Sequence, residues 1–198
     1  MQGRLEWSVV VLALVAWSLL WPLTAAAHAG HDAGSGFLSG LAHPVLGADH
    51  LVAMVAVGLW GAILRAPALW LLPVVFPMVM AIGGALGVLG VPLGFVEPVI
   101  ALSAVALGLL VAFAVGMPLT VAMILVGVFA LFHGHAHGTE LPEAANPFAY
   151  ALGFVIATGL LHLCGVALGM LLRWPAGSWV VRGSGAAIAV VGLAFLTA

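Results

Sequence analysis

Long apolar stretches, interrupted only by short segments rich in proline, glycine or charge, dominate this sequence of 198 residues. A helix needs about 20 predominantly apolar residues to cross a bilayer. The stretches predict six such spans, near residues 37–64, 68–90, 95–115, 117–133, 147–172 and 178–197. Because the spans use most of the chain, we expect an all-α integral membrane protein. Its six-helix bundle would form a single polytopic domain over residues 28–198.

The composition excludes several classes of soluble protein. Apolar residues make up 65% of the chain and charged residues 5%, against about 45–50% and 25% in soluble domains. The sequence has no lysine, which excludes a P-loop nucleotide site and a pyridoxal phosphate Schiff base. A net charge of −2 without a basic run argues against nucleic acid as a partner. We therefore expect the lipid bilayer as a partner and no organic cofactor.

The N-terminal segment has the three parts of a secretory signal peptide. Arg4 precedes a short apolar run, and small residues follow before residue 28. We expect cleavage after residue 27, so that 1–27 is removed; an uncleaved first helix is the alternative. His28 and His31 would then lie near the new N-terminus, where they are weaker candidate metal ligands.

The arginines predict the orientation of the spans. Arg65, Arg173 and Arg182 all fall on one side of the membrane if the mature N-terminus is outside. Cytoplasmic loops carry an excess of arginine and lysine in membrane proteins. We therefore expect a multi-pass protein of the bacterial inner membrane, with both the mature N-terminus and the C-terminus in the periplasm.

The first span is too long to be one straight helix. Its 28 residues would extend about 42 Å as a helix, whereas the hydrocarbon core is about 30 Å thick. Pro44 and Gly47 lie in its first half. We expect a break near Pro44/Gly47, followed by a continuous helix from about Asp49. Irregular backbone at this depth usually lines a cavity or is buried in protein.

The break lies among the most informative polar residues of the chain. His43, Asp49 and His50 are ionisable groups at membrane depth, where they cost several kcal/mol unless paired or facing a wet cavity. If the helix breaks, His43 can fold back toward His50, and both rings can bind one metal ion. Met54, one turn below His50, is a weaker candidate ligand. The alternative is that Asp49 and His50 only pair with each other.

A second histidine group follows the fourth span. His133, His135 and His137 alternate with small residues, and Glu140 comes shortly after them. Imidazole suits nickel, cobalt, zinc and copper. We expect this segment to be an outer loop that captures metal, with Glu140 as a weaker ligand. A flexible solvated loop is the alternative.

Two further polar residues each allow two interpretations. His162 lies near the middle of the fifth span, where it is either a metal ligand or a hydrogen-bonded core histidine. Glu97 lies near the outer end of the third span, as a weaker candidate ligand or as an interfacial carboxylate.

These motifs resemble those of the HupE/UreJ family. The resemblance rests on His43-Pro-x-x-Gly-x-Asp49-His50, on Phe132-His-Gly-His-Ala-His137-Gly-x-Glu140 and on His162-x-x-Gly165. Members are small bacterial membrane proteins encoded with hydrogenase or urease genes and regarded as nickel, sometimes cobalt, permeases. The resemblance implies that His43, Asp49 and His50 form the main transport site. It also implies nickel-enzyme maturation proteins as partners, and the chain is compatible with a homo-oligomer.

The sequence therefore favours a permease that imports Ni²⁺ or Co²⁺, with His162 passing the ion inward, and not an enzyme. Two alternatives stay open. One is an intramembrane zinc-dependent hydrolase in which His43, His50 and His162 hold the zinc ion. The other is an accessory subunit that handles metal without transporting it.

Overall fold

The computed structural model describes residues 35–141 and 146–197. Within these ranges the chain is helical and contains no strand. The expected signal peptide, together with His28 and His31, lies outside the described residues. The helices are α2 (Ser35–Leu46), α3 (Ala48–Leu64), α4 (Ala68–Val88), α5 (Val96–Ala112), α6 (Leu119–Thr139), α7 (Pro147–Gly169), the short 3₁₀ helix η2 (Met170–Arg173) and α8 (Gly177–Thr197).

Four helical segments are long and apolar enough to cross a membrane: α4, α6, α7 with η2, and α8. The bent pair α2 and α3 passes the same test together, which raises the number to five, and α5 is a shorter apolar helix of 17 residues. The described residues therefore form an all-helical, multi-pass membrane protein. The expected count of six spans stays a prediction.

The predicted break in the first span is confirmed. Helices α2 and α3 meet at an angle of 76°, and Gly47 between them has an extended backbone (φ −75°, ψ 102°). The Gly47 N–H still donates to the carbonyl of His43 at 2.9 Å, and the Gly47 carbonyl accepts from the N–H of Leu51 at 2.9 Å. The chain thus turns sharply without losing these backbone hydrogen bonds. Pro44 lies inside α2 rather than at the break.

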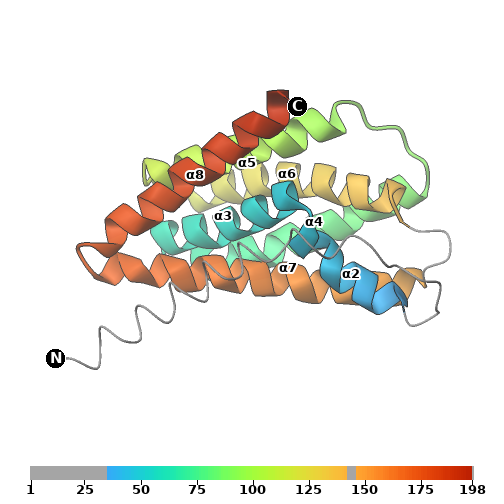
Figure 1. Cartoon of the computed structure of the whole chain (residues 1–198), viewed down its shortest axis with the longest axis horizontal. Helices are drawn as coiled ribbons and strands as arrows, with labels where there is room; N and C mark the ends of the chain where they lie inside the picture. Colours follow the sequence, from blue (N-terminus) through green and yellow to red (C-terminus); the bar gives the residue numbers. More distant parts are fainter. Residues whose placement is uncertain (1–34, 142–145, 198) are drawn as a thin grey trace. The chain divides into compact units, whose positions relative to one another are not determined.

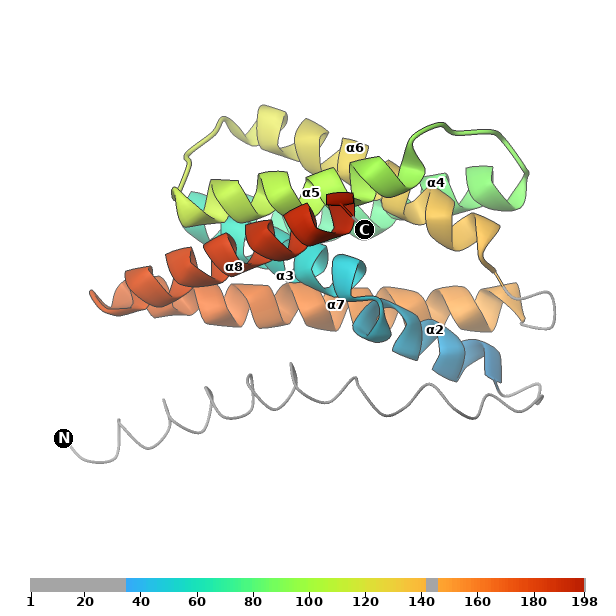
Figure 2. The same ribbon diagram turned by 45° about the horizontal axis from the view of Figure 1, so that its top comes forward.

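Helix α3 lies at the centre of the bundle, in contact with α2, α4, α5, α7 and α8 (Figures 1 and 2). Around it, α4 packs along α6, α5 packs along α8, and α7 packs along both α2 and α3. Glycine permits a close approach of α7 to α3, because a Cβ on Gly165 of α7 would collide with the carbonyl of Val55 on α3. This contact brings the middle of α7, with His162, against the central helix.

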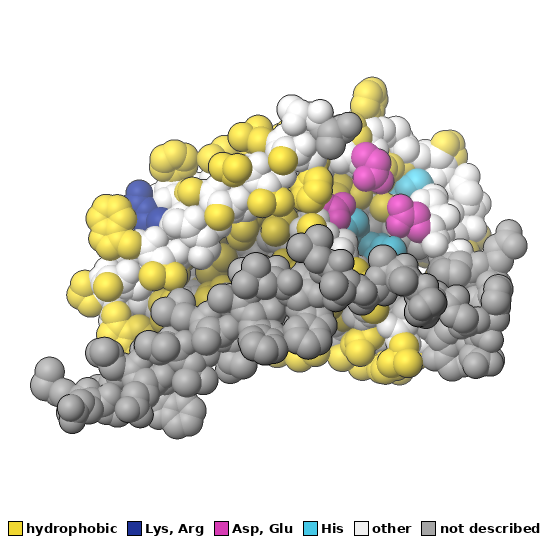
Figure 3. Space-filling model, viewed as in Figure 1, with side chains coloured by type: hydrophobic (Ala, Val, Ile, Leu, Met, Phe, Trp, Pro, Cys, Tyr) yellow, Lys and Arg dark blue, Asp and Glu magenta, His cyan; other side chains and the backbone are white. Residues whose placement is uncertain are grey.

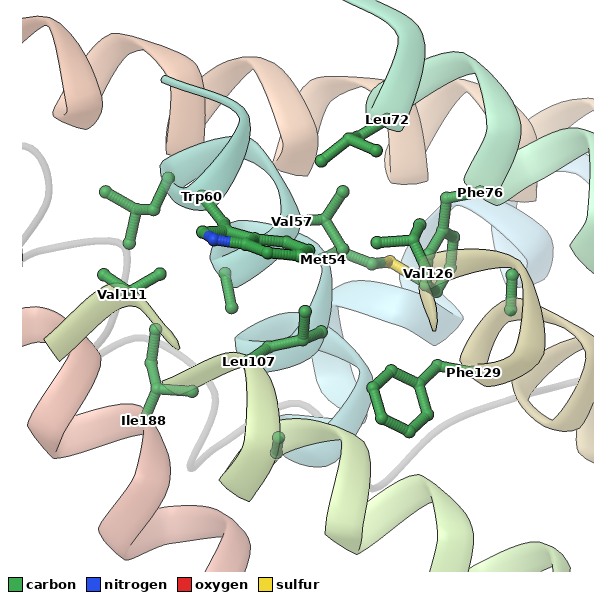
Figure 4. Packing of buried hydrophobic residues seen from close by; sticks show 14 of the residues in the cluster. Met54, Val57, Trp60, Leu72, Phe76, Leu107, Val111, Val126, Phe129 and Ile188 are labelled. Carbon is green, nitrogen blue, oxygen red and sulfur yellow. The ribbon is translucent and has the colours of Figure 1, made fainter. Parts of the chain in front are cut away.

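A fully buried apolar core surrounds the second half of α3. Trp60, Leu72, Phe76 and Leu107 have no exposed surface, and they interlock from α3, α4 and α5 (Figure 4). Many large apolar side chains on the outside of the helices are exposed instead, as the yellow surface in Figure 3 shows. Such a surface suits contact with lipid rather than water.

The structure corrects one expectation about the fourth span, which we placed at 117–133 with a histidine loop after it. Helix α6 continues to Thr139, so that segment is helical. The segment contains two glycines that pack against α4: a Cβ on Gly134 would collide with the carbonyl of Met80, and one on Gly138 with that of Gly84. Packing on α4 therefore stabilises these last turns.

Candidate metal site

Four imidazoles from three helices form a continuous chain of contacts. His43 of α2 lies 4.7 Å from His137 of α6 between ring centroids, His137 lies 4.3 Å from His50 of α3, and His50 lies 4.9 Å from His133 of α6. His43 and His50 are 6.1 Å apart across the bend. We call these four residues the histidine cluster. The bend at Gly47 and the helical register of α6 together create it.

Most ring nitrogens of the cluster are buried without a hydrogen-bond partner. Both nitrogens of His50 and of His137, and Nδ1 of His133, have no partner among the described residues. Asp49 Oδ1 lies 2.8 Å from His50 Nδ1, a close contact that lacks hydrogen-bond geometry. A buried polar group without a partner costs about 1–3 kcal/mol. A bound metal ion would satisfy several of these nitrogens at once.

Glu140 extends the cluster towards the surface. Its Oε2 lies 3.7 Å from Nε2 of His43, and its side chain is half-exposed. His43, His137 and Glu140 each offer one ligand atom, and these atoms lie within 4.8 Å of one another. Because ligand bonds to such ions are about 2.0–2.2 Å, a small movement of the side chains would let all three bind one ion.

A serine on α5 orients His133. Ser103 Oγ donates to the carbonyl of Ile100 at 2.6 Å and lies 2.9 Å from His133 Nε2. A hydroxyl has a single proton, so while it is donated to Ile100 the serine accepts a hydrogen bond from the Nε2–H of His133. This tautomer leaves a lone pair on Nδ1 of His133, which is available to a metal ion.

His135 does not join the cluster. The sequence grouped it with His133 and His137, but a helix rotates it about 160–200° away from both. Its Nε2 donates to the carbonyl of Val91 at 2.7 Å, in the segment between α4 and α5. The residue thus ties α6 to a neighbouring loop. Its role as a ligand stays a prediction that this geometry does not favour.

Aromatic side chains that the sequence analysis missed line the cluster. Phe154 of α7 lies 4.2 Å from His137 between ring centroids, and Tyr150 lies 6.1 Å from His43. They border a cavity of about 230 Å³ among α4, α6 and α7, which His137 also lines. The two residues are four positions apart, which puts both on one face of α7. This spacing was the sequence pattern that could have identified them.

The remaining candidates lie apart from the cluster. His162 is fully buried, with no hydrogen-bond partner for either ring nitrogen among the described residues. The ring of Phe76 lies between the two regions, 5.6 Å from His133 and 5.3 Å from His162. Met54 is packed in the apolar core (Figure 4). Glu97 is exposed in the first turn of α5.

Polar and charged groups are therefore segregated along the bundle. On the face drawn in Figure 3, acidic and histidine side chains gather together, and the basic side chain visible there lies at the other end. Helix α3 spans this separation, because it begins with Asp49 and His50 and is followed by Arg65. One end of the protein can bind a cation through nitrogen and oxygen ligands.

Comparison with known proteins agrees with the motifs. A family model described as HupE / UreJ protein matches residues 14–195. The chain belongs to the HupE/UreJ family. It is 47% identical over 192 residues to Protein HupE of Rhizobium leguminosarum bv. viciae, covering 97% of this chain and 99% of the relative. No solved structure matches the chain.

Family membership decides one of the alternatives. HupE/UreJ proteins are accessory, permease-like membrane proteins and not enzymes, so the interpretation as a zinc-dependent hydrolase is wrong. The family is associated with nickel and cobalt transport for hydrogenase and urease. The alternative of an accessory subunit that handles metal without transport remains open.

Proposed function

We propose that the chain is a permease that imports Ni²⁺ or Co²⁺ through the histidine cluster, for delivery to nickel-enzyme maturation proteins. The observation that carries this proposal is the convergence of His43, His50, His133 and His137 from three helices, with several buried ring nitrogens that lack a hydrogen-bond partner among the described residues. His50, His133 and His137 are buried and His43 is partly exposed, and buried polar atoms without partners are costly unless a ligand satisfies them.

The donor set supports a transition metal. Imidazole nitrogen binds nickel, cobalt, zinc and copper, whereas carboxylate oxygen alone favours magnesium and calcium. The cluster mixes both types, with Asp49 at His50 and Glu140 at His43. A transport site must also release its ion. An open set of mixed ligands, partly exposed at His43 and Glu140, suits release better than a closed four-ligand site.

The driving force needs no nucleotide site in this chain. The membrane potential contributes about 2.3 kcal/mol per charge per 100 mV, hence about 4.6 kcal/mol for a divalent cation. This potential drives a cation into the cell, and a cluster on the periplasmic side would meet the ion before it crosses the membrane. The positive-inside rule assigns Arg65, Arg173 and Arg182 to the cytoplasm, which supports that orientation.

The same orientation completes the topology that we propose. The chain would cross the bacterial inner membrane six times, with the bent pair α2 and α3 as its first span and α5 as its third, and with both mature ends in the periplasm. Helix α5 has 17 residues, the lower limit of about 17–25 for a span. Its first turn would then be periplasmic, at the same end as the histidine cluster.

Nickel uptake into cells that lack their own nickel importers tests the proposal. We expect wild type to accumulate radioactive nickel, and Asp49→Asn and His50→Ala to lose nearly all uptake at equal membrane abundance. Glu97→Gln is the matched carboxylate variant outside the cluster, and it should retain uptake. Unlabelled cobalt and zinc as competitors would rank the metals.

Two results would contradict the proposal in different ways. If wild type accumulates neither nickel nor cobalt, the permease interpretation is wrong. If uptake survives in Asp49→Asn but hydrogenase or urease maturation fails when the histidines of α6 are removed, the chain is a metal-handling accessory subunit instead.

A further inference from the structure

A second cavity lies at the opposite end of α3 from the histidine cluster. Its volume is about 520 Å³, within the range of about 300–1,000 Å³ for small-ligand sites. Its walls come from the ends of α3 and α7 and from the segment after α5. Arg65 and Arg173 line it together with apolar side chains that include Ile63, Met170 and Leu172.

The two arginines have no neutralising partner among the described residues. Neither forms an ion pair there: Asp49 and Glu140 contact histidines of the cluster, and Glu97 makes no ion pair with a described residue. Arg65 follows α3, whose 17 residues extend about 25 Å from Asp49. Two positive charges therefore border one cavity far from the acidic end of the protein, and the cavity favours an anion.

Arg182, by contrast, has a structural role at a helix end. Cations stabilise helix C-termini, and Arg182 does so directly, because its Nε donates to the carbonyl of Ala112 at the end of α5 at 2.7 Å. Arg65 and Arg173 make no such hydrogen bond within the described residues. The Arg173 guanidinium instead lies 4.1 Å over the ring of Trp174, a stacking that leaves its N–H groups available to an anion.

Exposed tryptophans indicate that this end lies at the level of the lipid headgroups. Trp70 is 57% exposed, Trp174 46% and Trp179 77%. Tryptophan is enriched at both membrane–water interfaces, where its ring sits at headgroup depth. The arginine-lined cavity is therefore next to phospholipid headgroups when the chain is in a membrane.

We infer that this cavity binds the phosphate group of an anionic phospholipid. Guanidinium groups bind phosphate through paired N–H···O hydrogen bonds, and basic pockets between membrane helices bind anionic headgroups. The apolar walls match the glycerol backbone and the first methylene groups of such a lipid better than they match a free hydrated ion. The site is independent of metal transport.

Native mass spectrometry of the full chain released from nanodiscs tests the inference. The nanodiscs contain phosphatidylcholine alone or phosphatidylcholine with phosphatidylglycerol. We expect wild type to retain phosphatidylglycerol in preference to phosphatidylcholine. Each charge-assisted hydrogen bond between an arginine and the phosphate should raise the affinity for the lipid about tenfold. The double variant Arg65→Gln/Arg173→Gln should therefore lose this preference entirely. Arg182→Gln, the matched control, should keep it.

A second variant separates lost binding from lost folding. Arg65→Lys/Arg173→Lys keeps both charges but not the paired hydrogen bonds, and it should retain phosphatidylglycerol at a reduced level. The inference is overturned if phosphatidylcholine is retained equally well, or if Arg182→Gln loses as much lipid as the double variant. If millimolar inorganic phosphate displaces the lipid completely, the occupant is a soluble phosphate and the assignment to a lipid is wrong.

Discussion

The histidine cluster and His162 are both buried imidazole sites, yet they differ in their surroundings. In the cluster each ring contacts at least one other ring, and Asp49 and Glu140 lie beside two of them. Among the described residues His162 contacts no other histidine, and Phe76 separates it from His133. Several candidate ligands in contact with one another therefore lie on one side of Phe76, and the candidate ligand His162 lies on the other.

This difference bears on how tightly each position can hold an ion. A site with several nitrogen and oxygen ligands can replace much of the hydration shell of an ion, whereas one imidazole replaces little of it. We therefore interpret the cluster as the position that selects and binds the metal. His162 is then a position through which the ion passes. Variants of the histidine cluster and of His162 can test these two roles separately.

The largest effect should come from the histidine that joins the others. His137 contacts both His43 and His50, so His137→Ala should reduce metal affinity by at least about 100-fold, beyond the 10–100-fold seen on losing an outer-shell partner. His135→Ala removes the same type of side chain from the same helix, two residues away. It breaks only the hydrogen bond to the carbonyl of Val91, and affinity should change less than about threefold.

Titration of the purified protein with Ni²⁺ in detergent measures both variants. If both variants lose metal affinity equally, His133, His135 and His137 act together, as the sequence pattern had indicated. In that case the helical register of α6 would not determine which of them bind the metal.

A smaller effect, on transport alone, is expected for His162. His162→Leu removes two buried ring nitrogens that lack partners within the described part of the chain, so thermal stability should be unchanged or higher. Metal affinity at the cluster should change little, because Phe76 lies between the two regions. Nickel uptake should nevertheless fall about tenfold, because the ion loses an imidazole contact on the far side of that ring.

Cys164→Leu is the control for this variant. Cys164 lies two residues along α7 and is exposed, so the same leucine there should leave uptake unaltered. If His162→Leu is stable and transports normally, His162 is a core residue without a role in the pathway.

The sequence predicted the bend and its consequence well, because both depend on local chemistry. Pro44 and Gly47 in an overlong span indicated the break, and a broken helix allows His43 to approach His50. The sequence was much less informative about α6. Its histidine-rich segment was expected to be a loop, whereas the segment is helical and its Gly134 and Gly138 pack against α4.

The residues that support the cluster could not be predicted for a related reason. Ser103, Phe76 and Phe154 come from three different helices, and local sequence offers only the four-residue spacing of Phe154 from Tyr150, which core residues share. Each gains its role from a contact across the bundle, with His133 or His137. Motifs identify residues whose chemistry is unusual, whereas ordinary residues that orient them emerge only from tertiary packing.

The smallest effect should come from Ser103, which orients a ligand without contacting the metal. Ser103→Ala removes the acceptor for the Nε2–H of His133, so the neutral ring is free to move its proton to Nδ1. Metal affinity should fall by less than tenfold, below the usual 10–100-fold, because α6 still holds the ring in place. Nitrogen NMR of labelled histidine should show a mixture of tautomers for His133 in the variant and one tautomer in wild type.

Ser184→Ala is the control, because it removes only a hydroxyl bonded to its own helix at Val180. It should change neither the metal affinity nor the tautomer of His133. If Ser103→Ala leaves the His133 tautomer unaltered, Ser103 does not determine which ring nitrogen of His133 is available to the metal. If wild type shows the proton on Nδ1, the serine donates to the ring instead, and Nδ1 is not the metal-binding nitrogen.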